Sequence, residues 1–233
     1  NLGILSKINS NDNLLSLSRL NYHYWGEYHV TNDADYFDDK EGKYLLFSGK
    51  AIGQYDCMSK SWLDKHGRSS LWKNTGFPKT TEYRTEYFVN EMPERIKIHH
   101  NKEKSDYRIV IQTVTGAINN MRTLYSAILP KKHLTNNSLS NLYIGNTDEE
   151  LIFYSAILNS FIVDWQARLK VATNLNKFIL DTLIVPDYKK TPEDIREKII
   201  EMSLSLYAVN SNFNNKKKKI KGKEISEVLI VSE

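Results

Sequence analysis

The stretch YRIVIQTVT, residues 107–115, constrains the fold more than any other part of the chain. Its residues alternate, which places every second side chain on the same face of an extended strand. One face carries Tyr107, Ile109, Ile111 and Thr113, and the other carries Arg108, Val110, Gln112 and Val114. The stretch RTLYSAILP, residues 122–130, favours a second strand that Pro130 ends. The six residues GAINNM between the two strands predict an antiparallel hairpin.

The last third of the chain has helical patterning. Thr147 followed by Glu150 forms a capping box, and the apolar residues after it recur at helical spacing over more than one face, which predicts a largely buried helix. Three helices are expected: from Asp148 to about Arg168, from Thr173 or Asn174 to Leu183, and from Thr191-Pro192 onward. Strands followed by helices predict an α+β fold, with a mixed, mainly antiparallel sheet and packed C-terminal helices.

The remaining elements divide the chain into four expected parts. These are a leading segment (1–24), a β-rich part (25–145), a helical part (146–210), and a basic tail with a short final element (211–233). Shorter strands are expected at 27–31, 43–47 and 83–89. Residues 59–81 contain turn formers and isolated aromatic residues without a period, which predicts a long surface loop of the kind that often carries function.

Composition limits the class of protein. The formal net charge of +4 allows a polyanionic partner without requiring one. Cys57 is the only cysteine, so no disulfide framework and no cysteine-based zinc site forms, and a reducing cytoplasm is the expected setting. Asn1 at the start predicts a piece of a longer protein without a targeting segment. The most apolar run, 151–163, is too short to span a bilayer.

Motifs for catalysis are missing from the sequence. It has no glycine-rich phosphate loop, no G-x-G-x-x-G and no G-x-S-x-G. His99-His100-Asn101 faintly resembles part of a metal-dependent nuclease, but no further ligands accompany it. The carboxylates of NDADYFDDKE lack the spacing of a calcium loop, which predicts a solvated acidic loop. A stand-alone nuclease therefore has little support.

Residues suited to nucleic acid gather on and beside the predicted hairpin. They are Arg108, Gln112, Asn119, Asn120, Arg122, Lys131 and Lys132. An asparagine can make a bidentate contact with adenine, although an Asn-Asn pair also simply suits a turn. The two lysines are suited to phosphates, or they belong to an exposed basic loop together with His133. The run Lys216–Lys219 is most simply a solvated tail.

A second polar group lies in LFSGKAIGQYD, residues 46–56. Gly49 and Gly53 would each weaken a strand, and glycine in such a place often allows a bend or a close approach of the backbone. Lys50, Gln54 and Tyr55 are candidate DNA contacts; Tyr55 as a core residue is the open alternative.

Four strings occur in one order and resemble a known family. They are WGEYHVTNDADYF (25–37), LFSGKAIGQYD (46–56), YRIVIQTVTGAINNMRTLYSAILP (107–130) and YSAILNSFIVDWQARLKVATNLNKFILDTLIVP (154–186). Together they resemble the C-terminal target-recognition domain, the TaqI-like specificity domain, of adenine-N6 DNA methyltransferases. That family includes fused type II restriction–modification enzymes and phage-defence methylases. Three departures bear on the target sequence: Gln112 replaces a common Arg, Met121 a common Glu, and Ala172 a common Gly.

The resemblance implies a domain that reads double-stranded DNA and contains no catalytic residues. Phosphate contacts are then expected from Lys50, Lys131, Lys132 and the basic segment 216–223, and base contacts from Gln54, Arg108, Asn119, Asn120 and Arg122, with Tyr55 and Gln112 beside them. The resemblance also implies that the parent protein is an enzyme using S-adenosylmethionine, with Mg²⁺ if an endonuclease is fused. The expected partners are DNA and a methyltransferase domain of the same polypeptide.

A different class of function remains open. The segment Leu151–Leu183 also suits a protein-interaction module that docks on a methyltransferase or nuclease core. In that case the helical part is a scaffold, and its surface contacts protein rather than DNA.

Overall fold

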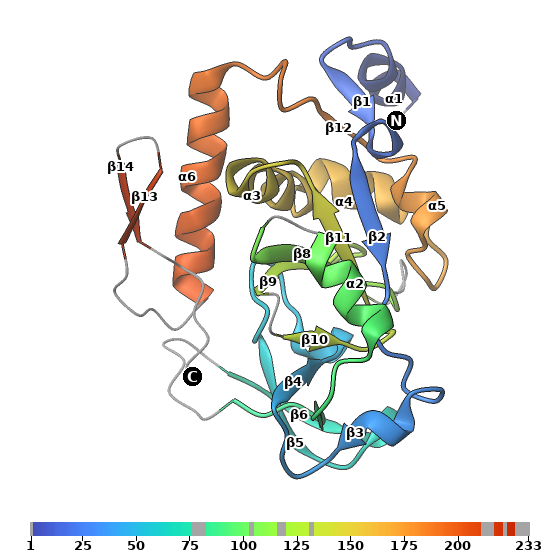
Figure 1. Cartoon of the computed structure of the whole chain (residues 1–233). Coiled ribbons are helices and arrows are strands. Elements are labelled where there is room, and N and C mark those ends of the chain that lie inside the picture. Colours follow the sequence, from blue (N-terminus) through green and yellow to red (C-terminus); the bar gives the residue numbers. More distant parts are fainter. Residues whose placement is uncertain are drawn as a thin grey trace.

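A four-stranded antiparallel sheet lies at the centre of the molecule (Figure 1). Its strands, in spatial order, are β2 (Tyr22–Trp25), β11 (Leu139–Ile144), β8 (Tyr107–Gln112) and β9 (Ser126–Pro130). The structure is a computed structural model, and it describes residues 2–75, 83–102, 105–115, 120–130, 133–210, 217–220 and 223–226. β8 and β9 pair antiparallel, with Ile109 opposite Ile128, so the predicted pairing is confirmed.

The second strand of this hairpin is shorter than predicted. It begins at Ser126 and not at Arg122, because the backbone N–H groups of Thr123 and Leu124 donate to the Asp164 carboxylate, in a helix. Backbone donors engaged in that way are not available to a strand ladder.

A second four-stranded sheet has the order β10 (Leu134–Thr135), β4 (Tyr44–Phe47), β7 (Tyr87–Val89) and β3 (Phe37–Asp38). β10 pairs parallel with β4, and the other neighbours are antiparallel. The strand expected at 27–31 is wrong: Tyr28 makes one isolated bridge to Asn136, and the strand nearby is β2. The α+β class with mainly antiparallel pairing is confirmed.

The helix predicted over 148–168 is two helices. α3 (Asp148–Leu158) begins with the predicted cap, since the Thr147 hydroxyl accepts from the Glu150 N–H at 3.2 Å. The Glu150 carboxylate accepts in return from the Asn146 N–H. Ser160 has an extended backbone, and its hydroxyl accepts from the Val163 N–H, so it caps a new helix, α4 (Phe161–Arg168). A serine that caps the following residues therefore divides the predicted helix.

The other helices surround the sheet. α5 (Lys177–Leu180) is shorter than predicted, and α6 (Glu193–Asn210) begins just after Pro192, as predicted. α3 lies between the central sheet and α6, where Ser155 and Tyr207 share a buried hydrogen bond of 2.6 Å. α2 (Glu94–Lys102) lies in front of the sheet in Figure 1. No helix within the described residues is long and apolar enough to cross a membrane.

The N-terminal residues join the helical part. After α1 (Leu2–Asn9), β1 (Leu14–Ser16) pairs antiparallel with β12 (Ile184–Pro186), so that Leu14 lies opposite Pro186. In the described part of the chain, four single-turn 3-10 helices lie in the connections: Leu17–Arg19, Ala34–Tyr36, Gly49–Ala51 and Gly67–Ser69. The boundaries predicted at 24/25 and 145/146 stay predictions.

The long loop expected at 59–81 is wrong over most of its length. Residues 60–74 form an antiparallel hairpin of β5 (Lys60–Asp64) and β6 (Leu71–Asn74), in which Trp62 lies opposite Trp72. A cross-strand aromatic pair stabilises such a hairpin. Near the C-terminal end, β13 (Lys217–Ile220) pairs with β14 (Lys223–Ser226).

Candidate nucleic-acid interface

Lys50 holds the β5–β6 hairpin. Its ammonium group donates to the Gly67 carbonyl at 3.0 Å and to the Ser70 hydroxyl at 2.6 Å, both at the tip of the hairpin. The 3-10 turn that carries Lys50 lies close to the central sheet, because the Gly49 N–H donates to the Ser138 hydroxyl at 2.7 Å. A Cβ at Gly49 would lie 3.1 Å from the Ser138 carbonyl oxygen, so the close approach depends on glycine. The exposed ammonium group of Lys50 thus holds the tip of the hairpin, and its role as a phosphate contact stays a prediction.

The Gln54-Tyr55 pair faces the helical part rather than solvent. Gly53 and Asp56 close a tight turn in which Tyr55 takes a left-handed φ of 56°. The Gln54 side-chain amide donates to the Asn159 carbonyl at 2.9 Å, and the Tyr55 hydroxyl donates to the Ala156 carbonyl at 3.4 Å. Burial raises the pKa of Tyr55 above its ordinary value. The segment 46–56 therefore connects the sheet, the hairpin and α3.

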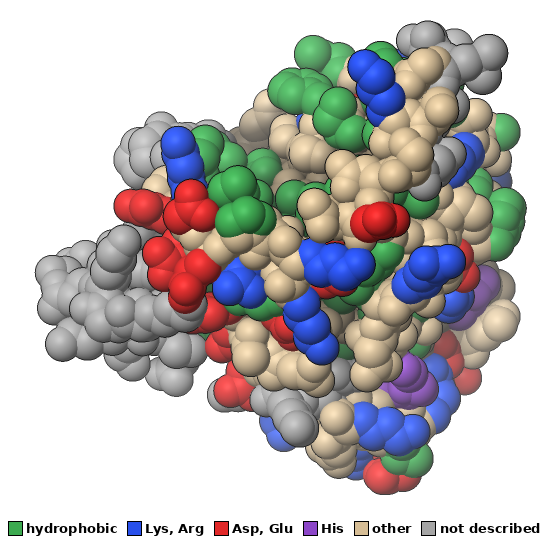
Figure 2. Space-filling model, turned by 90° about the horizontal axis from the view of Figure 1, so that it is seen from above, with side chains coloured by type: hydrophobic (Ala, Val, Ile, Leu, Met, Phe, Trp, Pro, Cys, Tyr) green, Lys and Arg blue, Asp and Glu red, His purple; other side chains and the backbone are tan. Residues whose placement is uncertain are grey.

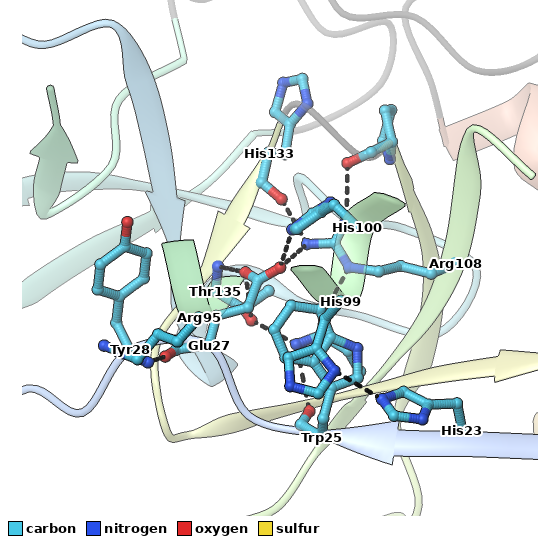
Figure 3. Close-up of polar contacts among 12 residues, drawn as sticks. His23, Trp25, Glu27, Tyr28, Arg95, His99, His100, Arg108, His133 and Thr135 are labelled. Atoms are coloured by element: carbon cyan, nitrogen blue, oxygen red, sulfur yellow. Dashed lines mark hydrogen bonds and ion pairs between the residues drawn. The ribbon is translucent and has the colours of Figure 1, made fainter. Parts of the chain in front are cut away.

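Arg108 is fully buried, although the sequence predicted it as a base contact. Figure 3 shows its guanidinium surrounded by acceptors. Nε donates to the Asn141 side chain at 2.6 Å, Nη1 to the Pro130 carbonyl at 2.9 Å, and Nη2 to Glu27 Oε1 at 2.9 Å and the His133 carbonyl at 2.5 Å. A charge in such a place is kept by its partners and faces no solvent from which a base can approach. We therefore reassign Arg108 to a structural role.

Glu27 is the acceptor at the centre of this network. Its Oε1 also accepts from His100 Nε2 at 2.7 Å. Its Oε2 accepts from the backbone N–H of Thr135 and, at 2.9 Å, from the Thr135 hydroxyl. The network therefore joins the chain at residue 27, α2, the central sheet and β10, and Figure 3 shows these groups converging on one carboxylate.

Arg122 and Asn120 lie at the junction of the hairpin connection and α4. The Arg122 side chain is mostly buried; it donates to the Asn159 carbonyl at 2.8 Å, and its guanidinium lies over the Phe161 ring. Asn120 is exposed, and its backbone carbonyl accepts from Arg168 at 2.9 Å. The structure thus gives Arg122 a packing contact and leaves the Asn120 side chain facing solvent.

The other predicted contacts divide into two groups. Gln112 is half-buried at the end of β8 and donates to the Val114 carbonyl at 3.0 Å. Asn119, Lys131 and Lys132 lie outside the described residues, as do three residues of the basic run 216–223.

His99 and His100 project in different directions, as expected for neighbours on a helix. His100 binds Glu27, whereas the His99 ring stacks on Trp25 with centroids 4.4 Å apart, and its Nδ1 lies 2.9 Å from His23 Nε2. Burial is the main cause that lowers the pKa of both His23 and His99. The charges of His99 and Lys102 lower the pKa of His23 further, and the charges of Lys102 and His100 lower that of His99. Among the described residues, no group of three or more His, Cys, Asp or Glu side chains is placed to hold a metal ion.

The His23–His99 pair is expected to make the fold less stable in acid. The folded state lowers the pKa of both rings below 6.5, the ordinary value that the unfolded chain keeps. The stability linked to the neutral pair is therefore complete above pH 6.5, and it is lost as the pH falls through the lowered folded-state values. His99→Phe keeps a ring on Trp25 and removes one titrating group. The urea midpoint of this variant should fall less between about pH 7.5 and about pH 5 than that of the wild type. An equal fall would contradict the prediction.

The tip of the β5–β6 hairpin is a defined surface that the sequence did not predict. Residues 63–69 are all exposed, and they include Asp64, Lys65, His66 and Arg68. The sequence contains an indication of a hairpin there: Trp62 and Asp64 are two residues apart, and a turn containing Gly67 follows them. The serines and the single glycine of this stretch, however, also suit an irregular loop.

Comparison with known proteins finds solved structures from restriction–modification systems. No family model matches the chain, and no curated protein does. The present chain is similar to a chain of a type I R-M system whose complex assembly and conformational transition have been described. The identity is 9%, and the TM-score is 0.46 over 83% of this chain. It is also similar to the HsdS subunit from Thermoanaerobacter tengcongensis, with 9% identity and a TM-score of 0.42 over 83% of this chain.

A third solved structure has a related description. The type IIG restriction endonuclease BpuSI shares 14% identity with a TM-score of 0.42 over 86% of this chain. The chain spans 37%, 36% and 28% of the three solved chains, or about a third of their length. The solved proteins to which this chain is similar thus include a chain of a type I R-M system, a HsdS subunit and a type IIG restriction endonuclease.

Proposed function

We propose that this chain is a double-stranded DNA target-recognition domain of a restriction–modification or phage-defence enzyme. The observation that carries the proposal is the distribution of charge. Residues 43–75 contain six Lys or Arg and two Asp, which equals the whole chain's net charge of +4 and leaves 26 basic and 26 acidic residues elsewhere. A local excess of positive charge is what attracts a polyanion.

The fold places residues 43–75 away from α6, a helix that begins with acidic side chains. β4, β5 and β6 lie at the lower end of Figure 1, whereas α6 lies at the upper left. Figure 2 views the molecule from above and shows acidic side chains gathered at the left, where α6 lies. The first turn of α6 contains Glu193 and Asp194. An acidic loop over residues 33–41 borders the basic segment on one side, so the proposed DNA surface is the remainder, with Lys60 and Lys73 exposed on it.

The strings that resemble the specificity-domain family contact one another. Gln54 and Arg122, from two of the strings, both donate to the Asn159 carbonyl of a third. Asp164 accepts from Thr123 and Leu124, each at 2.8 Å. The Leu175 N–H donates to the Thr113 carbonyl at 2.8 Å. These motif residues thus build a scaffold that orients the loops of the basic segment, which supports the resemblance.

The finer parts of the proposal concern the parent protein. In it, a methyltransferase domain of the same polypeptide would bind S-adenosylmethionine and modify adenine N6 after the base is flipped from the duplex. An endonuclease fused to it would require Mg²⁺. This chain supplies neither chemistry in the proposal; it selects the site, in the cytoplasm, and positions the DNA for the catalytic domain.

Salt dependence tests the proposal. The chain should bind a duplex of unrelated sequence with an affinity that falls as salt rises, by about 0.9 in the logarithmic slope per phosphate contact. Replacing Lys60 and Lys73 by Gln should make that slope shallower by about 1 to 2. The control is a double variant of Lys189 and Lys198, both exposed at the other end of the molecule, which should leave it unchanged.

A second candidate function rests on exposed apolar side chains. Phe161, Ile162, Leu169 and Phe178, on and next to α4 and α5, are between 53% and 81% exposed. Large apolar side chains exposed on two consecutive helices are a candidate surface for a protein contact. If the chain binds no duplex at any salt concentration, a docking role for this helical part takes the place of the DNA-reading role.

A further inference from the structure

The β5–β6 hairpin ends in a rigid, exposed tip. Two of its residues take left-handed backbone conformations, Lys65 with φ 58° and Gly67 with φ 64°. Such a conformation at a lysine is uncommon and costs free energy that the surrounding contacts must offset. The Trp62 indole N–H donates to the Lys65 carbonyl at 2.7 Å, and the Lys65 N–H donates to the Asp64 carboxylate at 2.8 Å.

Residues outside the hairpin hold the tip as well. The buried carboxylate of Glu86 accepts from the Gly67 N–H at 2.5 Å, and the ammonium of Lys50 donates to the Gly67 carbonyl at 3.0 Å. The backbone N–H and C=O of Gly67 are therefore both fixed by charged side chains from other parts of the chain. An exposed turn with this many constraints is preorganised, which lowers the entropy lost when it binds.

The side chains on the tip are suited to base edges and not only to phosphates. Asp64 supplies an acceptor, Lys65 and Arg68 supply donors, and His66 supplies either. Arg pairs with the O6 and N7 acceptors of guanine, and a carboxylate accepts from the N4 group of cytosine. The acidic neighbours lie on one flank: Asp39 and Glu86 each approach a nitrogen of His66 at 3.9 Å. Arg68 is exposed in the 3-10 turn Gly67–Ser69.

The hairpin is an element of a kind that the major groove admits. That groove is about 12 Å wide and admits a two-stranded β-ribbon. β5 and β6 form such a ribbon. Lys60 and Lys73 are exposed on it behind the tip, at successive register positions and so on opposite faces, where each is suited to phosphates on one side of the groove.

Resting on the proposed function, we propose that the tip of the β5–β6 hairpin enters the major groove, that Arg68 determines specificity there, and that Lys50 is a positioning residue. Arg68 reads a base edge, and Lys50 contacts no DNA but fixes the backbone that presents Arg68. Arg108 and Arg122, which are buried, are then not the reading residues, and the reading function belongs to a hairpin where the sequence predicts a loop.

The test is selection of bound duplexes from a library with a randomised central segment, with the full chain as the probe protein. The wild type should enrich a consensus. Arg68→Ala should lose the preference at one or two positions and bind the consensus duplex about 5- to 150-fold more weakly. Its affinity for a duplex without the consensus should change much less. Arg19→Ala, an exposed arginine near the N-terminal end, is the matched control and should select the wild-type consensus.

Lys50 is tested by a conservative pair of variants. Lys50→Met should lose base preference at the same positions as Arg68→Ala, and its amide exchange at Gly67 and Ser70 should become faster. Lys50→Arg should keep the base preference and the slow exchange of the wild type. If Lys50→Met unfolds, amide exchange at Gly67 and Ser70 in Lys50→Arg is measured in its place. The reading role of Arg68 does not depend on Lys50→Met, because Arg68→Ala tests it directly.

The outcomes separate this proposal from the one on which it rests. If the wild type selects a consensus and Arg68→Ala selects the same one with the same affinity, the hairpin does not read bases, and the DNA-recognition function stands. If the wild type binds duplex but enriches no consensus, base reading is overturned and non-specific binding remains. If the wild type binds no duplex, both proposals fail.

Discussion

Replacing Glu27 by Gln is expected to lower the free energy of unfolding by about 3–5 kcal/mol, because it leaves the buried charge of Arg108 without its counter-ion. The carboxylate accepts from His100 and Arg108 on one oxygen and twice from Thr135 on the other. In the Glu27→Gln variant one of these oxygens would be replaced by an amide NH₂, and in either orientation a donor would then face donors. Buried donors without acceptors add to the cost.

Urea unfolding measures this loss against a matched substitution. Glu94→Gln changes a carboxylate on α2 that is 74% exposed, and it should alter stability by less than about 0.5 kcal/mol. Equal midpoints for the two variants would show that the network around Glu27 contributes nothing. The double variant Glu27→Gln/Arg108→Met removes the uncompensated charge and should recover part of the loss.

Replacing Asp164 by Ala is expected to cost at least about 2 kcal/mol, since it leaves two buried backbone donors without an acceptor. Its carboxylate accepts from Thr123 and Leu124 at 2.8 Å each, and Arg122 Nε lies 4.0 Å from it. Amide exchange at residues 123 and 124 should become faster, because these N–H groups have lost their partner.

Asp194→Ala is the control for this prediction. Asp194 is an exposed carboxylate in the first turn of α6, where only its interaction with the helix dipole is lost, about 0.3–1 kcal/mol. If exchange at residues 123 and 124 is unchanged in Asp164→Ala, another group satisfies these donors and Asp164 is not the residue that fixes the hairpin connection.

Local patterns predicted the elements whose causes are local. The period-two alternation at 107–115 and the Pro130 stop predicted the β8–β9 pairing, and Thr147 with Glu150 predicted the start of α3. The break at Ser160 was also encoded locally, since a serine followed by Val163 and Asp164 is a helix start, but the continuous apolar stripe outweighed it. Two local patterns competed there, and the cap prevailed.

Contacts between distant residues explain the predictions that differ from the structure. Arg108 shares one face of its strand with Val110. No residue near it in the sequence shows that its counter-ion is Glu27, 81 residues earlier. Lys50 was predicted to contact phosphates because it is a lysine beside glycines, whereas its partners lie 17 and 20 residues later in a hairpin that was itself not predicted. In both cases a cation suited to DNA is engaged by the fold.

The pairing of β1 with β12 brings residue 14 beside residue 186. The long span between them therefore begins and ends at neighbouring strands of one short ladder. The two points of attachment stay adjacent whatever the span contains, but α6, outside the span, packs on α3 within it and completes the same core. A transplant that keeps this core therefore carries α6 together with residues 14–186, so that the helix and the ladder move as one unit.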